Sequence, residues 1–305
     1  MTQTKEKNFI SAVVYLNSGT GVVPFLSELD RQLDAHFEQY EIVAVNDGCA
    51  PAVIDQLRGF ARVGMKKPLT LVHMSLRQGV EACMNAGLDM AIGDFVYEFD
   101  STAMPYDAAL IWQAYEKALE GNDIVNVCPT HSKGSSRLFY RVFNLFHRSP
   151  YKLRTEAFRL VSRRAVNRVH AVSQDLPYRK AAYAASGLKM ATLTFEGKLN
   201  ARGGERFGLA VDSLALYTDA GYKISLGVAG CMLALTLAEL LYTLYIFFWR
   251  GHVIEGWTTT MLVLTVGFFG VFAILAMILK YQSLLVDLVF KKQKYLVEGI
   301  EKIQK

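Results

Sequence analysis

The chain has 305 residues, of which 52% are hydrophobic and 20% are charged, and its net charge is +5. This length and apolar content allow one sizeable domain with a membrane part, or two small domains, and the uneven distribution of apolar residues favours the first. No dense basic tract with interleaved aromatic residues is present, which argues against nucleic acid as a partner.

The first part of the chain alternates strand patterns with amphipathic helical patterns. Strands are predicted over residues 9–16, 41–45, 69–73, 94–99 and 123–127. Helices are predicted between them, over residues 22–37, 52–63, 79–90 and 108–120. This alternation predicts an α/β domain with a largely parallel sheet that helices cover.

Two acidic side chains follow predicted strands directly. Asp47 comes after the apolar run 41–45, and Asp100 comes after the strand 94–99, which itself follows a helix that we expect to end with Gly93 as its C-cap. Ligands of open α/β sheets bind beyond the carboxyl ends of the strands. We therefore expect Asp47 and Asp100 to converge on one edge of the sheet.

The loop that leads into the predicted helix 79–90 also carries charge. Arg77 and Glu81 flank Gly79, at a helix start where backbone N–H groups favour anions. Either side chain could belong to a binding site, or could be an ordinary charge near the helix terminus.

The character of the chain changes after residue 127. Segment 135–148 places aromatic residues and leucine on one helical face and arginines elsewhere. The pattern is typical of an interfacial helix, and equally of a helix packed on the sheet. A second amphipathic stretch, 209–217, precedes the apolar part of the chain.

Two long apolar segments follow, at residues 226–249 and 257–279. The first contains one charged residue, Glu239, and the second contains none. About 20 helical residues cross a hydrocarbon core of roughly 30 Å, so each segment is long enough to span a membrane. Burial inside a protein core is the alternative. The short link 250–256 then predicts a transmembrane hairpin.

Charge around the hairpin predicts its orientation. Lys223 precedes it and five lysines follow it within residues 291–305, whereas the link has a single arginine, which places both soluble ends in the cytoplasm. The first residues lack the apolar core of a signal peptide, and the four cysteines are scattered, as in a reducing compartment. We predict a multi-pass inner-membrane protein with its catalytic domain in the cytoplasm.

These patterns divide the chain into four parts. They are a domain at 1–205, a juxtamembrane segment at 206–223, two transmembrane helices at 224–281 and a cytoplasmic tail at 282–305.

Short motifs along the chain carry a resemblance to a known family. In order they are Val45-Asn-Asp-Gly48, Asn85-Ala-Gly-Leu88, Gly93-Asp94, Phe158-Arg-Leu-Val-Ser-Arg163, Tyr178-Arg179 and Lys291-Lys-Gln-Lys-Tyr-Leu-Val-Glu298. With them, the chain resembles the family 2 glycosyltransferases of GT-A fold. It is similar in particular to the polyprenyl-phosphate glycosyltransferases, which include dolichol-phosphate mannosyltransferase and bacterial undecaprenyl-phosphate sugar transferases.

The resemblance implies inverting transfer of a sugar from a nucleotide-diphosphate sugar to a polyprenyl phosphate. It also implies a homo-oligomer, namely a tetramer. Asn46 and Asp47 would bind the base or ribose of the donor, and Asp100 would lie near its diphosphate, at the first position of a metal-binding Asp-x-Asp motif.

The resemblance further implies that cationic side chains hold the phosphates of donor or acceptor. Arg159, Arg163 and Arg179 would do so, and Arg206 would stand where the family usually has a lysine before the membrane. Arg159 and Arg163 would lie one turn apart if their segment were helical.

The metal motif departs from the family pattern. Thr102 occupies its third position, and Met104 replaces a glutamine that can complete the metal shell. Mg²⁺ or Mn²⁺ could bind Asp100 with substrate phosphates and waters. Glu98 lies two residues back on the same strand face, and is either a second metal ligand or the partner of a basic residue.

The general base also departs from the family pattern. Relatives place an aspartate just before Phe-Arg-Leu, where this chain has Ala157, and Glu156 lies one residue away. A phosphate monoester has its second pKa near 6, so a lipid phosphate is already ionised and needs charge neutralisation more than a base. Glu156 and Asp175 remain candidates for a base or an orienting group. The departures also leave open a non-catalytic membrane scaffold that binds a nucleotide sugar or a partner transferase.

Overall fold

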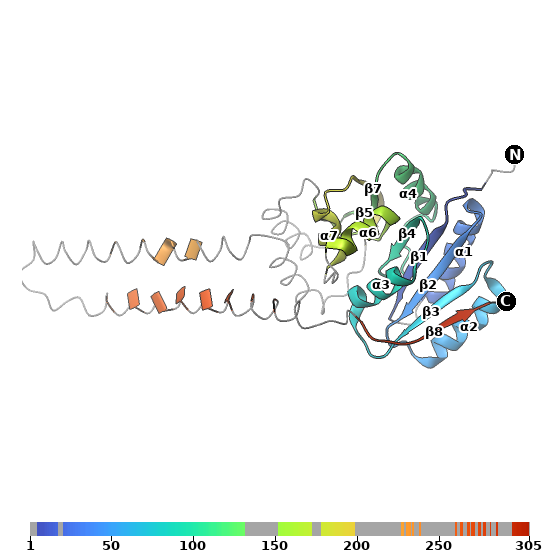
Figure 1. Cartoon of the computed structure of the whole chain (residues 1–305), viewed down its shortest axis with the longest axis horizontal. Helices are drawn as coiled ribbons and strands as arrows, with labels where there is room; N and C mark the ends of the chain where they lie inside the picture. Colours follow the sequence, from blue (N-terminus) through green and yellow to red (C-terminus); the bar gives the residue numbers. More distant parts are fainter. Residues whose placement is uncertain are drawn as a thin grey trace, which may run out of the picture. The chain divides into compact units, whose positions relative to one another are not determined.

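The computed structural model describes residues 5–17, 21–131, 152–172, 178–198 and 295–304, with scattered helical residues between 227 and 285. The chain forms two compact units. One combines Met1–Ala210 with Gln293–Lys305, and the other is Val211–Lys292. All named strands and helices of the described residues lie in the first unit (Figure 1).

A mixed sheet forms the centre of the first unit. Its eight strands, in chain order, are β1 Ile10–Leu16, β2 Tyr40–Asn46, β3 Leu69–Met74, β4 Phe95–Phe99, β5 Ile124–His131, β6 Phe158–Ser162, β7 Met190–Lys198 and β8 Val297–Ile303. Their spatial order is β7-β5-β6-β4-β1-β2-β3-β8. Within this sheet β6 and β8 run antiparallel to their neighbours and the other strands run parallel. The predicted α/β architecture with a mostly parallel sheet is confirmed.

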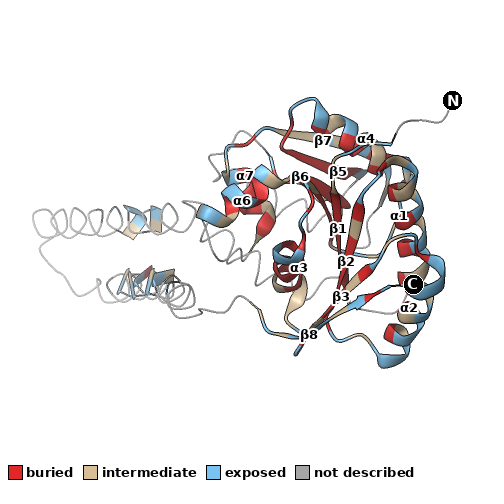
Figure 2. Ribbon diagram, turned by 45° about the vertical axis from the view of Figure 1, so that its right-hand side comes forward, coloured by how far each residue is buried: buried red, intermediate tan, exposed pale blue. Residues whose placement is uncertain are grey.

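Helices cover both faces of the sheet. They are α1 Val22–His36, α2 Pro51–Gly64, α3 Gly79–Met90, α4 Ala109–Leu119, α6 Arg163–Val172 and α7 Arg179–Ala185. Figure 2 shows α1, α2 and α4 on one face and α3, α6 and α7 on the other. Every residue of β1 is buried, as expected of a central strand between two helical layers.

The two faces differ in what they bury. Under α1, α2 and α4 lies the main apolar core, which includes alternate residues of β1 such as Ala12 and Val14. Val13 points the other way, toward α3, where Gly87 lets the helix approach so closely that an added Cβ would come within 2.3 Å of Val13 Cγ1. The polar cluster described below also lies on this second face.

The C-terminal residues complete the sheet. Val297–Ile303 pairs with β3 in antiparallel register, with Ile303 opposite Leu69 and Gly299 opposite His73. Ile303 is buried in the main core. Glu301 forms an ion pair with Arg58 of α2, with 2.8 Å between Glu301 Oε2 and Arg58 Nη2. The sequence assigned 282–305 to a tail beyond the hairpin, but seven of its residues are a strand of the N-terminal unit.

Several predicted segments lie outside the described residues. These are the amphipathic segment 135–148, the juxtamembrane segment 206–223 and most of the hairpin 224–281. In the part of the chain that the structure describes, no helix has both the length and the apolar character needed to cross a membrane. The hairpin therefore stays a prediction.

Gly93 has a different role from the C-cap that the sequence indicated. Helix α3 ends at Met90 with Ala91 as its C-cap, and Gly93 lies in the link to β4. Its amide donates to Ser11 Oγ at 2.8 Å, and a Cβ there would come within 2.5 Å of the Ser11 backbone nitrogen. The link therefore passes so close to β1 that a side chain has no room.

We predict that Gly93→Ala destabilises the protein by about 2 kcal/mol, because the clash is with backbone and the strand must shift. Gly59→Ala is the control. Gly59 lies on an exposed position of α2 with nothing within 4 Å of its added Cβ, so helix propensity should make that change neutral or slightly stabilising. Thermal unfolding of the full chain in detergent measures both. Equal midpoints for the two variants would contradict the close approach.

Candidate functional site

The two acidic residues expected at one sheet edge are placed there. Asp47 directly follows β2 and Asp100 directly follows β4, and β1 separates these strands, parallel to both. At about 4.8 Å per strand, the two residues lie on strands roughly 10 Å apart. The carboxyl edge therefore presents acidic groups from two neighbouring loops, where α/β sheets bind ligands.

Asp47 organises the loop between β3 and α3. It is 2% exposed, and its Oδ1 accepts a hydrogen bond from the Gln78 backbone N–H at 2.8 Å. Its Oδ2 accepts from the Gly79 N–H at 3.1 Å and from the Tyr15 hydroxyl at 2.8 Å. Burial and the Asp47 charge raise the pKa of Tyr15, so the phenol remains a donor. Asp47 thus fixes the start of α3.

Asn46 organises the loop that follows β2. Its Oδ1 accepts from the Cys49 N–H at 2.8 Å, and its Nδ2 lies 3.1 Å from Nδ1 of His73. Beyond it, the exposed Arg77 extends over Gly48, whose carbonyl accepts from Arg77 Nη2 at 3.3 Å. The edge near Asp47 therefore presents an exposed guanidinium, and Arg77 is the site residue whose part the sequence left open.

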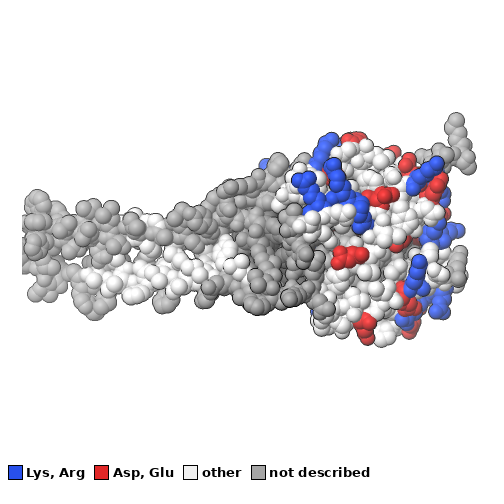
Figure 3. Space-filling view, viewed as in Figure 1, with Lys and Arg blue, Asp and Glu red and all other residues white. Residues whose placement is uncertain are grey.

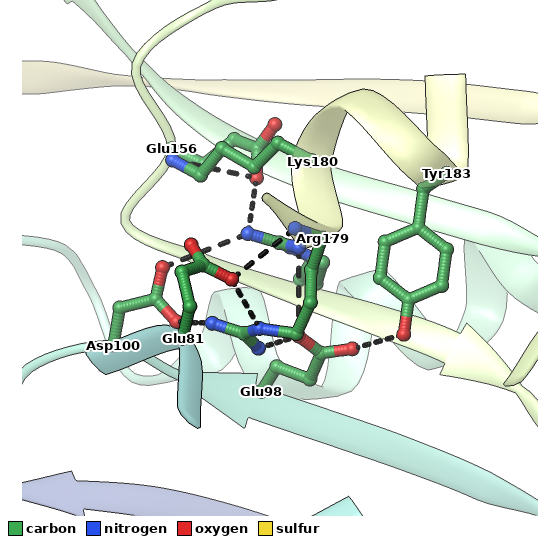
Figure 4. A network of polar contacts seen from close by, with 8 residues as sticks. Glu81, Glu98, Asp100, Glu156, Arg179, Lys180 and Tyr183 are labelled. Atoms are coloured by element: carbon green, nitrogen blue, oxygen red, sulfur yellow. Dashed lines mark hydrogen bonds and ion pairs between the residues drawn. The ribbon is translucent and has the colours of Figure 1, made fainter. Parts of the chain in front are cut away.

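A buried arginine joins three elements at the other side of the edge (Figure 4). Arg179, on α7, is 0% exposed, and its Nε donates to Glu81 Oε2 of α3 at 2.8 Å. Its Nη1 pairs with Glu98 Oε2 of β4, and its Nη2 donates to Asp100 Oδ1 at 2.7 Å. One guanidinium thus uses all three of its nitrogens on carboxylates. Glu81 is a buried partner of this arginine, not a solvated charge of the first helical turn.

A second buried arginine lies beside the first. Arg159, opposite Glu98 in the sheet, is 2% exposed, and its Nη1 is 3.4 Å from Glu98 Oε2. Its Nη2 is 3.6 Å from Asp100 Oδ2 and 3.1 Å from Glu156 Oε2. Neither Arg159 Nη1 nor Glu156 Oε2 makes a hydrogen bond among the described residues, so the contact of Nη1 with Glu98 and that of Glu156 Oε2 with Arg159 Nη2 are ion pairs.

Two residues of α7 complete the cluster. The Tyr183 hydroxyl donates to Glu98 Oε1 at 2.6 Å, and Lys180 Nζ lies 3.8 Å from Glu156 Oε2. Tyr183 follows Arg179 by four residues, so both point to the same side of the helix. That spacing was the available signal for Tyr183, which was not among the residues predicted from the sequence.

The electrostatic field of the cluster keeps Asp100 ionised. Burial alone would raise the pKa of Asp100, but the positive charges of Arg179 and Arg159 hold that pKa well below its usual range. Burial likewise opposes the charge of Arg179, and the carboxylates of Glu81, Asp100 and Glu98 raise its pKa nonetheless. The side chain of Asp100 is 28% exposed, so this ionised carboxylate is a partly exposed member of a largely buried network.

Arg163 is not part of the site. Phe158–Ser162 is a strand, so the helical spacing considered for Arg159 and Arg163 is wrong. Arg163 instead begins α6 at the amino end of β4, where its guanidinium donates to the carbonyl oxygens of Gly93 at 2.9 Å and Ala91 at 2.7 Å. It stabilises the link after α3. Arg206 lies outside the described residues.

The charges of the site differ from those of the surface. On the face of the first unit seen in Figure 3, acidic and basic side chains are interspersed, and basic ones gather over α6. Arg159, Arg179 and Glu98 are almost completely buried instead. Removing such charges from water is costly unless they are paired, which explains why four carboxylates surround two arginines.

The two expected metal ligands differ in their fit to a divalent ion. Glu98 is 1% exposed, and its oxygens already contact Arg179, Arg159 and Tyr183, so it does not fit as a ligand. It is the partner of basic residues, which was the alternative. Asp100 fits as a ligand, because its side chain is partly exposed. Its Oδ2 lies 3.6 Å from Arg159 Nη2, which is beyond hydrogen-bond distance, so this oxygen can coordinate an ion. The described residues contain no group of three acidic, histidine or cysteine side chains that could hold a metal ion.

Comparisons with known proteins agree with this geometry. Residues 13–183 match the family described as glycosyl transferase family 2. Glycosyltransferase YkcC of Bacillus subtilis strain 168 is 23% identical over 291 residues, which cover 90% of this chain and 88% of that protein. Glycosyltransferase sll0501 of Synechocystis sp. is 26% identical over 164 residues, which cover 52% of this chain and 51% of that protein.

A solved structure shares the fold. Mannosyltransferase PcManGT from Pyrobaculum calidifontis, in complex with GDP-Man and Mn²⁺, has a TM-score of 0.53 to this chain. The similarity covers 94% of this chain and 89% of that one, at 13% sequence identity. At this identity the likeness concerns the arrangement of strands and helices.

We predict that Arg179→Met destabilises the protein by about 3–5 kcal/mol, because it leaves three carboxylates without their shared cation in a buried site. The double variant Arg179→Met with Glu98→Gln should recover part of the loss, since one buried charge is removed. Arg164→Met is the control, because the Arg164 side chain is 73% exposed and pairs with one carboxylate, that of Asp123, which also accepts a hydrogen bond from Ser162 Oγ. Thermal unfolding of the three variants and the wild type tests this. A loss for Arg179→Met no larger than for Arg164→Met would show that the cluster does not stabilise the fold.

Proposed function

The chain belongs to glycosyl transferase family 2, and we propose that it transfers a sugar from a nucleotide-diphosphate donor to a polyprenyl phosphate. The glycosyltransferase class and the nucleotide-sugar donor follow from the family. The observation that supports a transferase site is the ionised, partly exposed Asp100 at the carboxyl edge of the sheet. Asp100 follows β4, Asp47 follows β2, and only β1 separates these two strands.

The proposed reaction is a single displacement with inversion. An oxygen of the acceptor phosphate forms a bond to the anomeric carbon as the bond between that carbon and the donor diphosphate oxygen breaks. The bonding electron pair leaves with the nucleoside diphosphate. The acceptor oxygen carries no proton at neutral pH, so no residue has to act as a base.

Glu156 fits an orienting role better than that of a base. Its side chain is 5% exposed, and it contacts Arg159 at 3.1 Å and Lys180 at 3.8 Å. A buried carboxylate in contact with two cations is held in one position between them. Its effect is to hold Lys180 and Arg159 beside Asp100.

The buried arginines act through Asp100 in this proposal. Arg179 and Arg159 direct their guanidinium groups at carboxylates, so they fix the position and charge of Asp100 in place of direct phosphate contact. Arg77 is exposed over Gly48 and can approach the donor phosphates. Mg²⁺ or Mn²⁺, held by Asp100, would neutralise the charge that develops on the leaving diphosphate.

The acceptor and the location rest on the sequence. The segments 226–249 and 257–279 would anchor the protein in the inner membrane, with the sheet on the cytoplasmic side. A lipid phosphate is the acceptor that such an anchor brings to the site. Assembly as a homo-oligomer is part of the same proposal.

A non-catalytic scaffold is the second candidate. Thr102 and Met104 occupy positions where relatives have metal ligands, and the arginine nitrogens of Arg179 are all occupied by carboxylates. A protein that only binds nucleotide sugars would keep the Asp47 loop and tolerate these changes.

Transfer of label decides between the two candidates. Purified full-length protein in detergent is incubated with undecaprenyl phosphate and a panel of uridine and guanosine diphosphate sugars, with Mg²⁺, with Mn²⁺ and with a chelator. We expect labelled lipid from one donor, and a loss of product on chelation if Asp100 holds an ion. Nucleotide binding without product from any donor would favour the scaffold.

Asp100→Asn tests the catalytic carboxylate. We expect kcat to fall by at least about 100-fold, because the neutral amide cannot neutralise a metal ion or retain the charge of the pair with Arg179. Asp55→Asn is the matched control, since the Asp55 side chain is 69% exposed on α2 and its activity should equal wild type. Full activity of Asp100→Asn, with an unchanged unfolding midpoint, would remove Asp100 from the mechanism.

A further inference from the structure

The segment just before β8 binds the loop that Asp47 organises. The side chain of Gln78 contacts both backbone groups of Leu296, donating from Nε2 to the Leu296 carbonyl at 2.7 Å and accepting at Oε1 from the Leu296 N–H at 2.8 Å. A side-chain amide that matches a backbone amide in this way fixes both the position and the orientation of the loop.

The same carbonyl also binds the other end of the loop. Ser75 donates to the Leu296 oxygen from its backbone N–H at 3.0 Å and from its hydroxyl at 3.2 Å. Ser75, Leu76 and Arg77 are themselves exposed, so these contacts replace the packing that the loop lacks. The strand register shifts between His73 and Met74, where the loop leaves β3, and such irregularities redirect a chain.

The backbone of Gln78 is hydrogen-bonded to Asp47. Its N–H donates to Asp47 Oδ1 at 2.8 Å, and the next N–H, of Gly79, lies 3.1 Å from Asp47 Oδ2. The loop 75–79 is therefore held from inside the domain by Asp47 and from outside by Leu296. One residue, Gln78, makes both sets of contacts.

A further contact fixes the same C-terminal segment along α3. The hydroxyl of Tyr295 donates to Asp89 Oδ2, near the end of that helix, at 2.7 Å. Tyr295 and Leu296 therefore bind α3 near both its ends, before β8 begins at Val297. The segment is attached by side chains as well as by its strand ladder.

We propose that this C-terminal segment is a positioning element of the donor site, in which Leu296, through Gln78, holds loop 75–79, which Asp47 fixes from its other side, in the conformation that binds the donor nucleotide. The proposal rests on the function proposed above. It means that residues which follow the unit Val211–Lys292 in the chain complete a site built by the first third of the sequence.

Gln78→Ala tests the coupling in the full-length protein in detergent. We expect the donor KM and the Kd for the nucleoside diphosphate to rise about tenfold, which corresponds to about 1.4 kcal/mol, with kcat within about twofold of wild type. Gln56→Ala is the matched control, because Gln56 is an exposed glutamine on α2, and it should change neither value. Gln78→Glu keeps the acceptor for the Leu296 N–H and should restore part of the affinity.

Hydrogen exchange separates this proposal from the function on which it rests. In Gln78→Ala without nucleotide, the amides of Gln78 and Gly79 should exchange faster, while those of β1 remain protected and the unfolding midpoint is retained. Unchanged exchange of the two amides, or an unchanged donor KM, would overturn the positioning role. Faster exchange in a protein whose wild type binds no nucleotide would overturn the proposed donor site and the donor-positioning role, and leave only a structural link.

Discussion

The burial of the Arg179 guanidinium among three carboxylates is the interaction on which the site depends. Glu81 comes from α3, Glu98 from β4 and Asp100 from the residue that follows β4. Without a common cation, their negative charges would repel one another in a site that water does not screen. A buried charge is tolerated when its partners are complete, and removal of one partner is costly. Helix α7 is therefore attached to the sheet by charge and by Tyr183, and Asp100 owes its ionised state to that attachment.

This network divides the basic residues of the chain into two kinds. Arg159 and Arg179 are internal, and they set the position and charge of the carboxylates. Arg77 is exposed at the same edge, near Asp47. The internal pair supplies positive charge at fixed positions, because burial holds both side chains in one conformation. The exposed side chain of Arg77 can instead contact a ligand directly. The C-terminal segment then holds the loop that carries the exposed one.

The sequence predicted the strand and helix alternation well because each element buries a regular apolar face. Asp47 and Asp100 were found because a polar residue that follows an apolar run marks a strand end. Arg163 was misplaced because its role depended on whether Phe158–Ser162 is a strand or a helix. That short segment is a strand because its backbone pairs with β4 on one side and with β5 on the other, and no local pattern contains these pairings. Its neighbours in the sheet decided its conformation.

The sequence by itself determined the fold class, the family and the two acidic ends of β2 and β4, because these follow from local periodicity and short motifs. Only the tertiary structure decided that Glu98 pairs with arginines, that Arg163 lies at the opposite end of β4 from Asp100, and that Val297–Ile303 joins β3. Each of these depends on contacts between segments tens or hundreds of residues apart. Charge pairing and strand pairing act through space, and a single sequence specifies which groups can pair without showing which ones meet.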